Sequence, residues 1–342
     1  MKILLVTSQA SFTDQFKKAL EANGSEVFYF DDRENMILPP LLKNNKFLWR
    51  VSRKIHPLRR LSNRILGRKL VATARELKPD LVLFNKAMVI KKDTLAHLNS
   101  MGIKTANWFL DNVQIKPYAN WFLKNYNSYD FLLIFDSYAK DLMKDKQDSS
   151  RIKYLPMAVD PNAYKFEGLS EDDRNKYSCD VCFVGALYPE RERILNIIQK
   201  MGVTLKIYGW KGWEKTSLAP NYFGPLNTKE TVKLYNCAKI CLNMNTTPPV
   251  SGVNFKTFEI SAAGGFQLSD YRKDVEALFV VGKEIEIFHN DQELKEKINF
   301  YLKNLELAGS IVEAAKIRII HDHTLKKRAA EILRIIGVGS AS

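Results

Sequence analysis

The chain has 342 residues, a formal net charge of +14 and 46% hydrophobic residues, which is enough apolar material for well-packed globular domains. Its length exceeds the usual size of a single hydrophobic core, so two domains are expected. No run of about 18 apolar residues occurs, which argues against a membrane-spanning helix, and the first residues, MKILLVTSQ, turn polar too soon for a signal peptide.

The first half of the chain alternates apolar runs typical of strands with helical patterns. Strands are expected at 2–8, 25–31, 78–85, 103–111 and 129–135, and helices at 12–24, 91–102 and 137–144. Strands and helices that alternate in this way predict a parallel, doubly wound sheet. We therefore expect an N-terminal Rossmann-like domain over residues 1–157.

Polar, turn-rich residues 158–178 break the alternation and predict a linker between domains. The alternation then resumes and predicts a second Rossmann-like domain over 179–323, in which a strand is expected to end at Gly224. The chain is helical from about 291 onward, and a final helix over about 324–338 is expected to pack on the first domain.

Glycines end two strands of the second half, Gly185 in FVGALYPERERIL and Gly209 in IYGWKGW, where a backbone or a ligand can approach closely. Arg191 lies near a helix start, where a cation interacts unfavourably with the helix dipole. A phosphate bound there would explain its presence. The alternative is that Arg191 lies on a solvated helix face. Trp210 could line a base or sugar pocket or serve domain packing. The fingerprint G-x-G-x-x-G is absent after the first strand, which argues against a nicotinamide or flavin enzyme.

The segment NFKTFEISAAGG predicts a helix whose N-cap is Asn254. Lys256 and Glu259 share one side of this helix at a spacing of three. That spacing allows a surface ion pair. It equally allows two contacts with one ligand, the ammonium with phosphate and the carboxylate with ribose hydroxyls, while the N–H groups of the first turn meet a diphosphate.

Polar residues also follow strands in the first half. Asp111 could accept a proton or bind a sugar hydroxyl, with a helix cap as the alternative. Asn85 and Lys86 could line the acceptor side or form a turn. His321 and His323 favour a structural or surface role over that of a base. The four cysteines lie in or beside strand-like runs and indicate buried, reduced thiols rather than a zinc site.

Between Glu34 and Glu76 the chain carries eleven Lys or Arg residues and no acid. Such a block indicates an anionic partner. Pro57 suits the start of a helix. Four arginines of this helix lie outside its apolar face, and Trp49 precedes them in the chain: Arg59, Arg60, Arg64 and Arg68. An anionic membrane surface, a phosphorylated lipid acceptor and a solvated face are all compatible with this pattern. Nucleic acid is not expected, because no recognition motif accompanies the cations.

The motifs above, together with FGPLNTKETVKLYNCAKICLNMN, HDHTLKKRAAEIL, KPDLVLFNKA and YLPMAVDP, resemble the CgeB-like glycosyltransferases, relatives of the group 1 family. The resemblance covers nearly the whole chain. It implies a GT-B fold, in which two Rossmann-like domains face each other across a cleft, the second domain holds a nucleotide-sugar and the first holds the acceptor. It also implies that no metal or cofactor is required.

In the family, the position of Glu259 holds the donor ribose as the second acid of an E-x7-E motif. The first acid is replaced here by Ser251, which leaves the anomeric outcome open, and Lys256 stands where the family usually has arginine. Arg191 matches an arginine of the strand-to-helix segment. The donor residues expected are Glu259, Lys256, Asn254, Arg191, Gly185, Gly209, Trp210 and Gly224.

The resulting prediction is a cytoplasmic enzyme, peripheral to the inner face of the membrane. It moves a hexose-type sugar from a nucleoside diphosphate, UDP as the first choice, to a hydroxyl of a surface glycan, lipid-linked or protein acceptor, with retention. The alternative is an inactive GT-B-like protein that binds an anionic membrane or another polyanion, and the loss of the first acid at Ser251 favours it.

Overall fold

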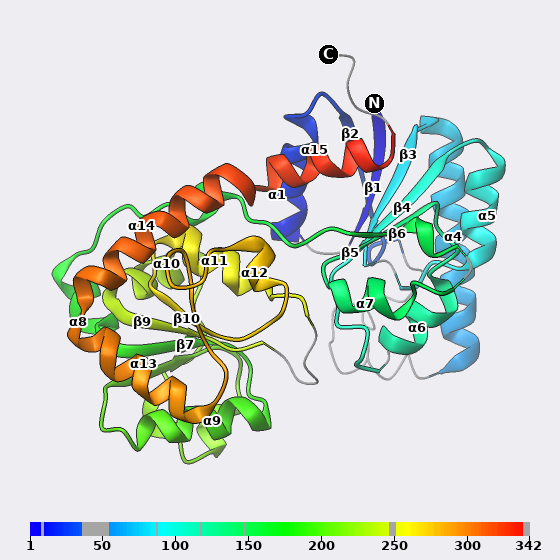
Figure 1. The fold of residues 1–342 in the computed structure, drawn as a ribbon. Coiled ribbons are helices and arrows are strands. Elements are labelled where there is room, and N and C mark those ends of the chain that lie inside the picture. Colours follow the sequence, from blue (N-terminus) through cyan, green and yellow to red (C-terminus); the bar gives the residue numbers. More distant parts are fainter. Residues whose placement is uncertain are drawn as a thin grey trace. The chain divides into compact units, whose positions relative to one another are not determined.

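The computed structural model describes residues 1–7, 10–35, 55–86, 88–116, 118–146, 148–245 and 251–337. The chain forms two compact units (Figure 1). Residues 1–156 and 325–342 make up the first unit, and residues 157–324 make up the second. No helix among the described residues is both long and apolar enough to cross a membrane.

The first unit is built on a six-stranded parallel sheet with the order β2-β1-β3-β4-β5-β6. Its strands are β1 (Lys2–Thr7), β2 (Glu26–Asp31), β3 (Leu81–Asn85), β4 (Lys104–Phe109), β5 (Phe131–Ile134) and β6 (Ile152–Tyr154). Every residue of β3 is buried, as expected for a strand of a parallel sheet that is covered on both faces.

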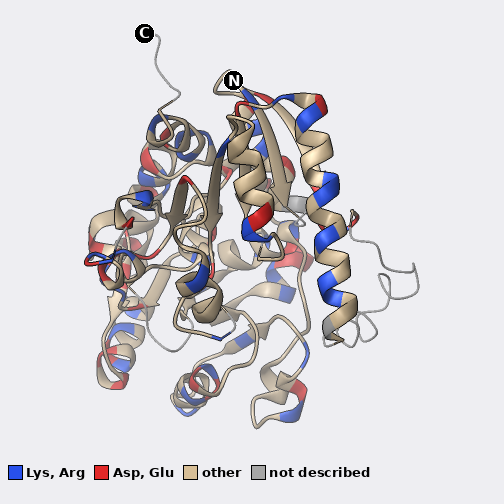
Figure 2. Cartoon of the chain, turned by 90° about the vertical axis from the view of Figure 1, so that its right-hand side faces the viewer, with Lys and Arg blue, Asp and Glu red and all other residues tan. Residues whose placement is uncertain are grey.

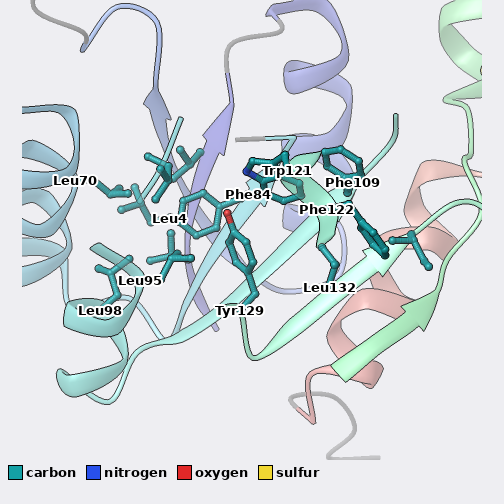
Figure 3. Close-up of a cluster of buried hydrophobic side chains, with 14 of the residues drawn as sticks. Leu4, Leu70, Phe84, Leu95, Leu98, Phe109, Trp121, Phe122, Tyr129 and Leu132 are labelled. Atoms are coloured by element: carbon teal, nitrogen blue, oxygen red, sulfur yellow. The ribbon is translucent and has the colours of Figure 1, made fainter. Parts of the chain in front are cut away.

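Four helices share one hydrophobic core with this sheet: α4 (His56–Leu77), α5 (Lys92–Ser100), α6 (Tyr118–Asn125) and α7 (Ser137–Leu142). In Figure 3, Leu70 of α4 and Leu95 of α5 pack near Phe84 of β3, and Trp121 of α6 lies beside Phe109 of β4. The ring centroids of Phe109 and Trp121 are 4.7 Å apart. This packing fixes α4 and α5 as neighbours.

The last helix, α15 (Leu325–Ile335), belongs to the first unit and contacts α1 (Ala10–Glu21). Asn23, just after α1, donates from Nδ2 to the carbonyl of Lys326 at 2.9 Å. Lys104 of β4 donates from Nζ to the carbonyl of Ile336 at 3.0 Å. The last helix is thus tied to the rest of the first unit by hydrogen bonds as well as by packing.

The second unit contains a five-stranded parallel sheet with the order β11-β10-β9-β7-β8. Its strands are β7 (Cys179–Val184), β8 (Leu205–Tyr208), β9 (Ala238–Asn243), β10 (Gln267–Asp270) and β11 (Glu286–Phe288). Its α-helices are α8 (Glu171–Tyr177), α9 (Pro189–Gln199), α10 (Thr228–Cys237), α11 (Phe255–Ala263), α12 (Val275–Leu278), α13 (Asp291–Lys303) and α14 (Leu305–Asp322). Parallel strands bring all their carboxyl ends to one edge, where ligands bind in folds of this kind.

Residues 158–178, predicted as a linker, are instead folded into the second unit. They form the 3-10 helix η2 (Pro161–Tyr164) and the helix α8, which starts with a capping box between Ser170 and Asp173. Lys233 of α10 pairs with Asp173 at 2.8 Å, and Tyr177 is buried. The polar composition that suggested a linker reflects a capped helix and its ion pair.

Candidate functional site

The turns after β7 and β8 lie against each other at the carboxyl edge of the second sheet. Gly209 has φ +141°, and a Cβ added to it would collide with the carbonyl of Gly185. The same carbonyl accepts a hydrogen bond from Nε1 of the buried Trp213 at 3.0 Å. Glycine is therefore required at Gly209 both by its backbone conformation and by the close approach of the two turns.

Arg191, in the first turn of α9, links the β7–α9 turn to the end of β9. Its Nη1 donates to the carbonyl of Ala186 at 3.0 Å and its Nη2 to the carbonyl of Met244 at 2.7 Å. The guanidinium lies over the rings of Phe183 and Tyr188, 5.4 and 5.0 Å from their centroids. Burial lowers the pKa of Arg191, and Tyr188 and Asp270 partly oppose this effect. The result is an oriented cation at the carboxyl edge.

The N-terminus of α11 is fixed at the same place. Asn254 caps the helix by accepting from the N–H of Thr257 at 3.2 Å. Its Nδ2 donates to Oδ1 of Asn243 at 2.9 Å and to the carbonyl of Met244 at 3.4 Å. Arg191 and Asn254 therefore share one acceptor, and the structure brings these two predicted donor residues together.

Glu259, one turn further along α11, has partners on both oxygens. Its Oε1 accepts a short hydrogen bond from the hydroxyl of Tyr164 in η2, and its Oε2 accepts from Nζ of Lys256 at 2.8 Å. Burial and the Glu259 charge both raise the pKa of Tyr164. The predicted Lys256–Glu259 ion pair is present, and the carboxylate is held in place by Tyr164, which the sequence did not indicate.

A polar network that sequence reasoning missed supports the end of β9. Asp270, the last residue of β10, accepts from the backbone N–H and Nδ2 of Asn245 at 2.9 and 2.7 Å and from Nη2 of Arg272 at 2.6 Å. Asn245 in turn accepts from the N–H of Asn254 at 2.8 Å. Burial raises the pKa of Asp270, and Arg272 and Asn245 partly offset this shift. The available signal was the polar residue at the end of each strand, in CLNMN and QLSD.

The other predicted donor residues lie outside this network. Trp210 is 71% exposed. Gly224 does not end a strand, because the only pairing of residues 221–224 with the sheet is an isolated bridge between Tyr222 and Ile207. Its carbonyl accepts from the N–H of Gly209 at 2.9 Å, so the backbone of Gly224 supports the turn at Gly209. Ser251 is partly buried, and its carbonyl accepts from the N–H of Asp274 at 3.0 Å.

In the first unit, two predicted residues meet after β3 and β4. Nζ of Lys86 lies 2.8 Å from Oδ2 of Asp111 and 4.9 Å from the ring centroid of Tyr118. Burial alone would lower the pKa of Lys86, but Asp111 and Tyr118 raise it above its ordinary value. Asp111 does not cap α6, which starts seven positions later at Tyr118. Asn85 is buried at the end of β3, and its Nδ2 has no hydrogen-bond partner among the described residues.

The four predicted arginines of the anionic surface lie on α4, and Trp49 lies outside the described residues. Arg60, Arg64 and Arg68 are exposed, whereas Arg59 is partly buried. Leu61 of α4 would share the apolar face expected from helical spacing, but it is 54% exposed, because the core contacts of α4 start one turn later, at Leu66.

The histidines and cysteines form no metal site in the described part of the chain, where no cluster of three or more His, Cys, Asp or Glu side chains occurs. His323 is buried and packs on Phe258 and Phe279. The cysteines are free thiols, and burial raises the pKa of Cys179 and of Cys182.

Comparison with known structures identifies the architecture. The chain is similar to sucrose-phosphate synthase from Thermosynechococcus elongatus, with a TM-score of 0.71, 10% identity and 98% of each chain covered. It is also similar to HepE of Anabaena in complex with UDP-glucose, with a TM-score of 0.68, 12% identity and coverage of 98% of this chain and 99% of that chain. The fold is GT-B. Trehalose-6-phosphate synthase shares it at a TM-score of 0.65 and 11% identity, with 99% and 100% of the two chains covered.

Sequence comparison covers a smaller part of the chain. Residues 191–334 match the model of a family described as glycosyl transferase-like. This segment starts at Arg191 and includes β9, α11 and β10, so it contains most of the network described above. No curated protein sequence matches the chain.

Proposed function

We propose that this GT-B protein is a glycosyltransferase that moves a hexose-type sugar from a nucleoside diphosphate to an acceptor hydroxyl. The observation that carries the proposal is the meeting of Arg191 and Asn254 on the carbonyl of Met244, at the first turn of α11. This arrangement directs a cation and a helix N-terminus to the carboxyl edge of the second sheet, the combination that binds phosphate groups. The glycosyl transferase-like segment contains it.

The donor would be bound by the second unit. The diphosphate contacts Arg191, Lys256 and the first turn of α11, and these positive groups stabilise the charge that develops on the leaving group. Glu259, oriented by Tyr164, accepts hydrogen bonds from the ribose hydroxyls. UDP is the proposed nucleotide, since the structurally similar HepE has been solved with UDP-glucose.

The acceptor would be bound by the first unit, where Lys86 holds the carboxylate of Asp111. A carboxylate oxygen has capacity for more than one hydrogen bond, so Asp111 can accept from a sugar hydroxyl while it stays paired with Lys86. The proposed acceptors are a glycan, a lipid-linked sugar or a protein. We propose that the reaction needs no metal. We also propose that it proceeds with retention, which is the kind of glycosyl transfer studied in the structurally similar trehalose-6-phosphate synthase.

The test is a thermal-shift and calorimetry panel of nucleotides and nucleotide-sugars, with and without EDTA. A ligand at a hundred times its dissociation constant adds about 2.7 kcal/mol of stability, so UDP and UDP-glucose should stabilise the chain clearly. Binding followed by release of UDP in the presence of sugar acceptors supports the enzyme. Binding without any turnover supports the inactive binding protein, and binding of no nucleotide refutes the donor site.

A further inference from the structure

A groove with a volume of about 500 Å³ lies between α4 and α5 in the first unit, and none of the donor or acceptor residues proposed above lines it. Its cations are Arg64, Arg68 and Arg75 of α4 and Lys91 at the start of α5, and Asp93 is its one carboxylate. Four cations against one acid make the groove a strongly positive surface. Figure 2 shows blue Lys and Arg positions along α4 beside the neighbouring α5.

The arginines form a stripe rather than a scattered set. Arg60, Arg64, Arg68 and Arg75 are exposed and follow one another at intervals of four, four and seven residues, which places them on one side of a helix with 3.6 residues per turn. Like charges at a spacing of four destabilise a helix by a few tenths of a kcal/mol per pair. An anion bound along the stripe would remove this repulsion.

Arg64, Arg68 and Lys91 make no ion pair with any carboxylate among the residues that the structure describes. Arg75 is directed toward His97 of α5, with Nη2 and Nε2 3.5 Å apart. The guanidinium groups of Arg64 and Arg68 and the ammonium group of Lys91 can therefore donate hydrogen bonds to a bound anion. Guanidinium groups bind phosphate through two parallel hydrogen bonds, and lysine adds a point charge.

The floor of the groove depends on Gly67. A Cβ at this position would collide with Oγ1 of Thr94 on α5, so the absence of a side chain lets the two helices approach and brings Lys91 close to the arginine stripe. Thr94 lines the same groove, and its side chain carries a neutral hydrogen-bonding group.

We propose that the α4–α5 groove binds a phosphate-bearing ligand, independently of the nucleotide-sugar. The phosphate belongs either to an anionic lipid headgroup or to a soluble phosphorylated molecule, and the same cations would recognise both. The proposal needs no catalytic role for the groove, and it stands even if the chain transfers no sugar.

The test compares two triple variants of the full chain. The groove variant is Arg64→Gln/Arg68→Gln/Lys91→Gln, and the control, Lys69→Gln/Lys124→Gln/Lys140→Gln, removes three exposed charges of the same unit outside the groove. One probe is pyrophosphate in calorimetry at low salt. The other is sedimentation with vesicles of phosphatidylserine and phosphatidylcholine, with phosphatidylcholine alone as the neutral reference.

At about 1 kcal/mol for each cation near an anionic surface, the groove variant should bind anionic vesicles about 100-fold more weakly than the wild type. If the ligand is soluble, pyrophosphate affinity should instead fall by at least about tenfold. The control should stay within about threefold of the wild type for the probe that binds. If the triple groove variant does not fold, the single variant Arg68→Gln replaces it. Its affinity for anionic vesicles should be about fivefold lower than that of the wild type.

Binding of either probe that is lost in the groove variant and kept in the control supports the proposal, and the probe that binds identifies the source of the phosphate. The proposal is overturned if the wild type binds neither probe at low salt, or if the control loses as much binding as the groove variant. UDP-glucose affinity, measured on the same samples, reports separately on the donor site.

Discussion

The Glu259→Ala substitution removes a carboxylate whose oxygens serve two partners, Tyr164 and Lys256. Tyr164 is 7% exposed, so the loss of its acceptor leaves a buried hydroxyl unpaired, which costs roughly 1–3 kcal/mol. In a domain of this size each kcal/mol lowers the melting temperature by roughly 2–4 °C. We therefore expect the variant to fold and to melt roughly 2–12 °C lower than the wild type by circular dichroism.

The same variant should bind UDP-glucose more weakly, because a charged hydrogen bond to the ribose contributes about 1.5–3 kcal/mol, equivalent to about 10–150-fold in affinity. Calorimetry below the melting temperature measures this. Tyr164→Phe is the matched control, since it removes the same Tyr164–Glu259 hydrogen bond but keeps the carboxylate. It should lower the melting temperature while affinity for UDP-glucose stays within about threefold, because Lys256 still holds the other oxygen of the carboxylate. Wild-type affinity in Glu259→Ala would refute the ribose role and leave Glu259 as a structural acid.

Gly209→Ala is expected to destabilise the second unit by at least about 2 kcal/mol in chemical denaturation, because the new Cβ meets the carbonyl of Gly185. Gly202→Ala also has a positive φ but no atom within 4 Å, so it should cost only about 1 kcal/mol; equal costs would show that the close approach is unimportant. Asp111→Asn, which breaks the pair with Lys86, should lower the transfer rate by at least about tenfold with unchanged UDP-glucose affinity, and an unchanged rate would remove Asp111 from the acceptor site. EDTA should leave transfer intact, whereas a loss that magnesium restores would contradict a metal-free mechanism.

The glycine turns and the start of α11 could be predicted because their signals are local. Gly185 and Gly209 directly follow β7 and β8, and Asn254 caps α11 as its position before an apolar helix suggested. The ion pair of Lys256 and Glu259 follows from helix periodicity alone. A short stretch of sequence contains all the information that these features need.

The network around Asp270 could not be predicted in the same way. It joins Asn245 and Arg272, and through Asn245 it reaches Asn254. The connection depends on β9 and β10 lying side by side in register, which no single segment reveals. Tyr164 is a similar case, because it reaches Glu259 across 95 positions.

The predicted linker failed for a different reason. Its acidic cluster caps and pairs α8 within the second unit instead of remaining solvated. Composition alone does not distinguish a polar linker from a short capped helix at a domain surface. The partners that decide the outcome, such as Lys233, lie about 60 positions away.

A crystal structure with bound UDP tests the central claim most directly. We predict that the diphosphate lies at the first turn of α11, with Arg191 and Lys256 within hydrogen-bonding distance, and that the ribose hydroxyls contact Glu259. UDP bound elsewhere, with the side chains of Arg191 and Glu259 still engaged only by Met244, Ala186, Tyr164 and Lys256, would contradict the assignment of the donor site.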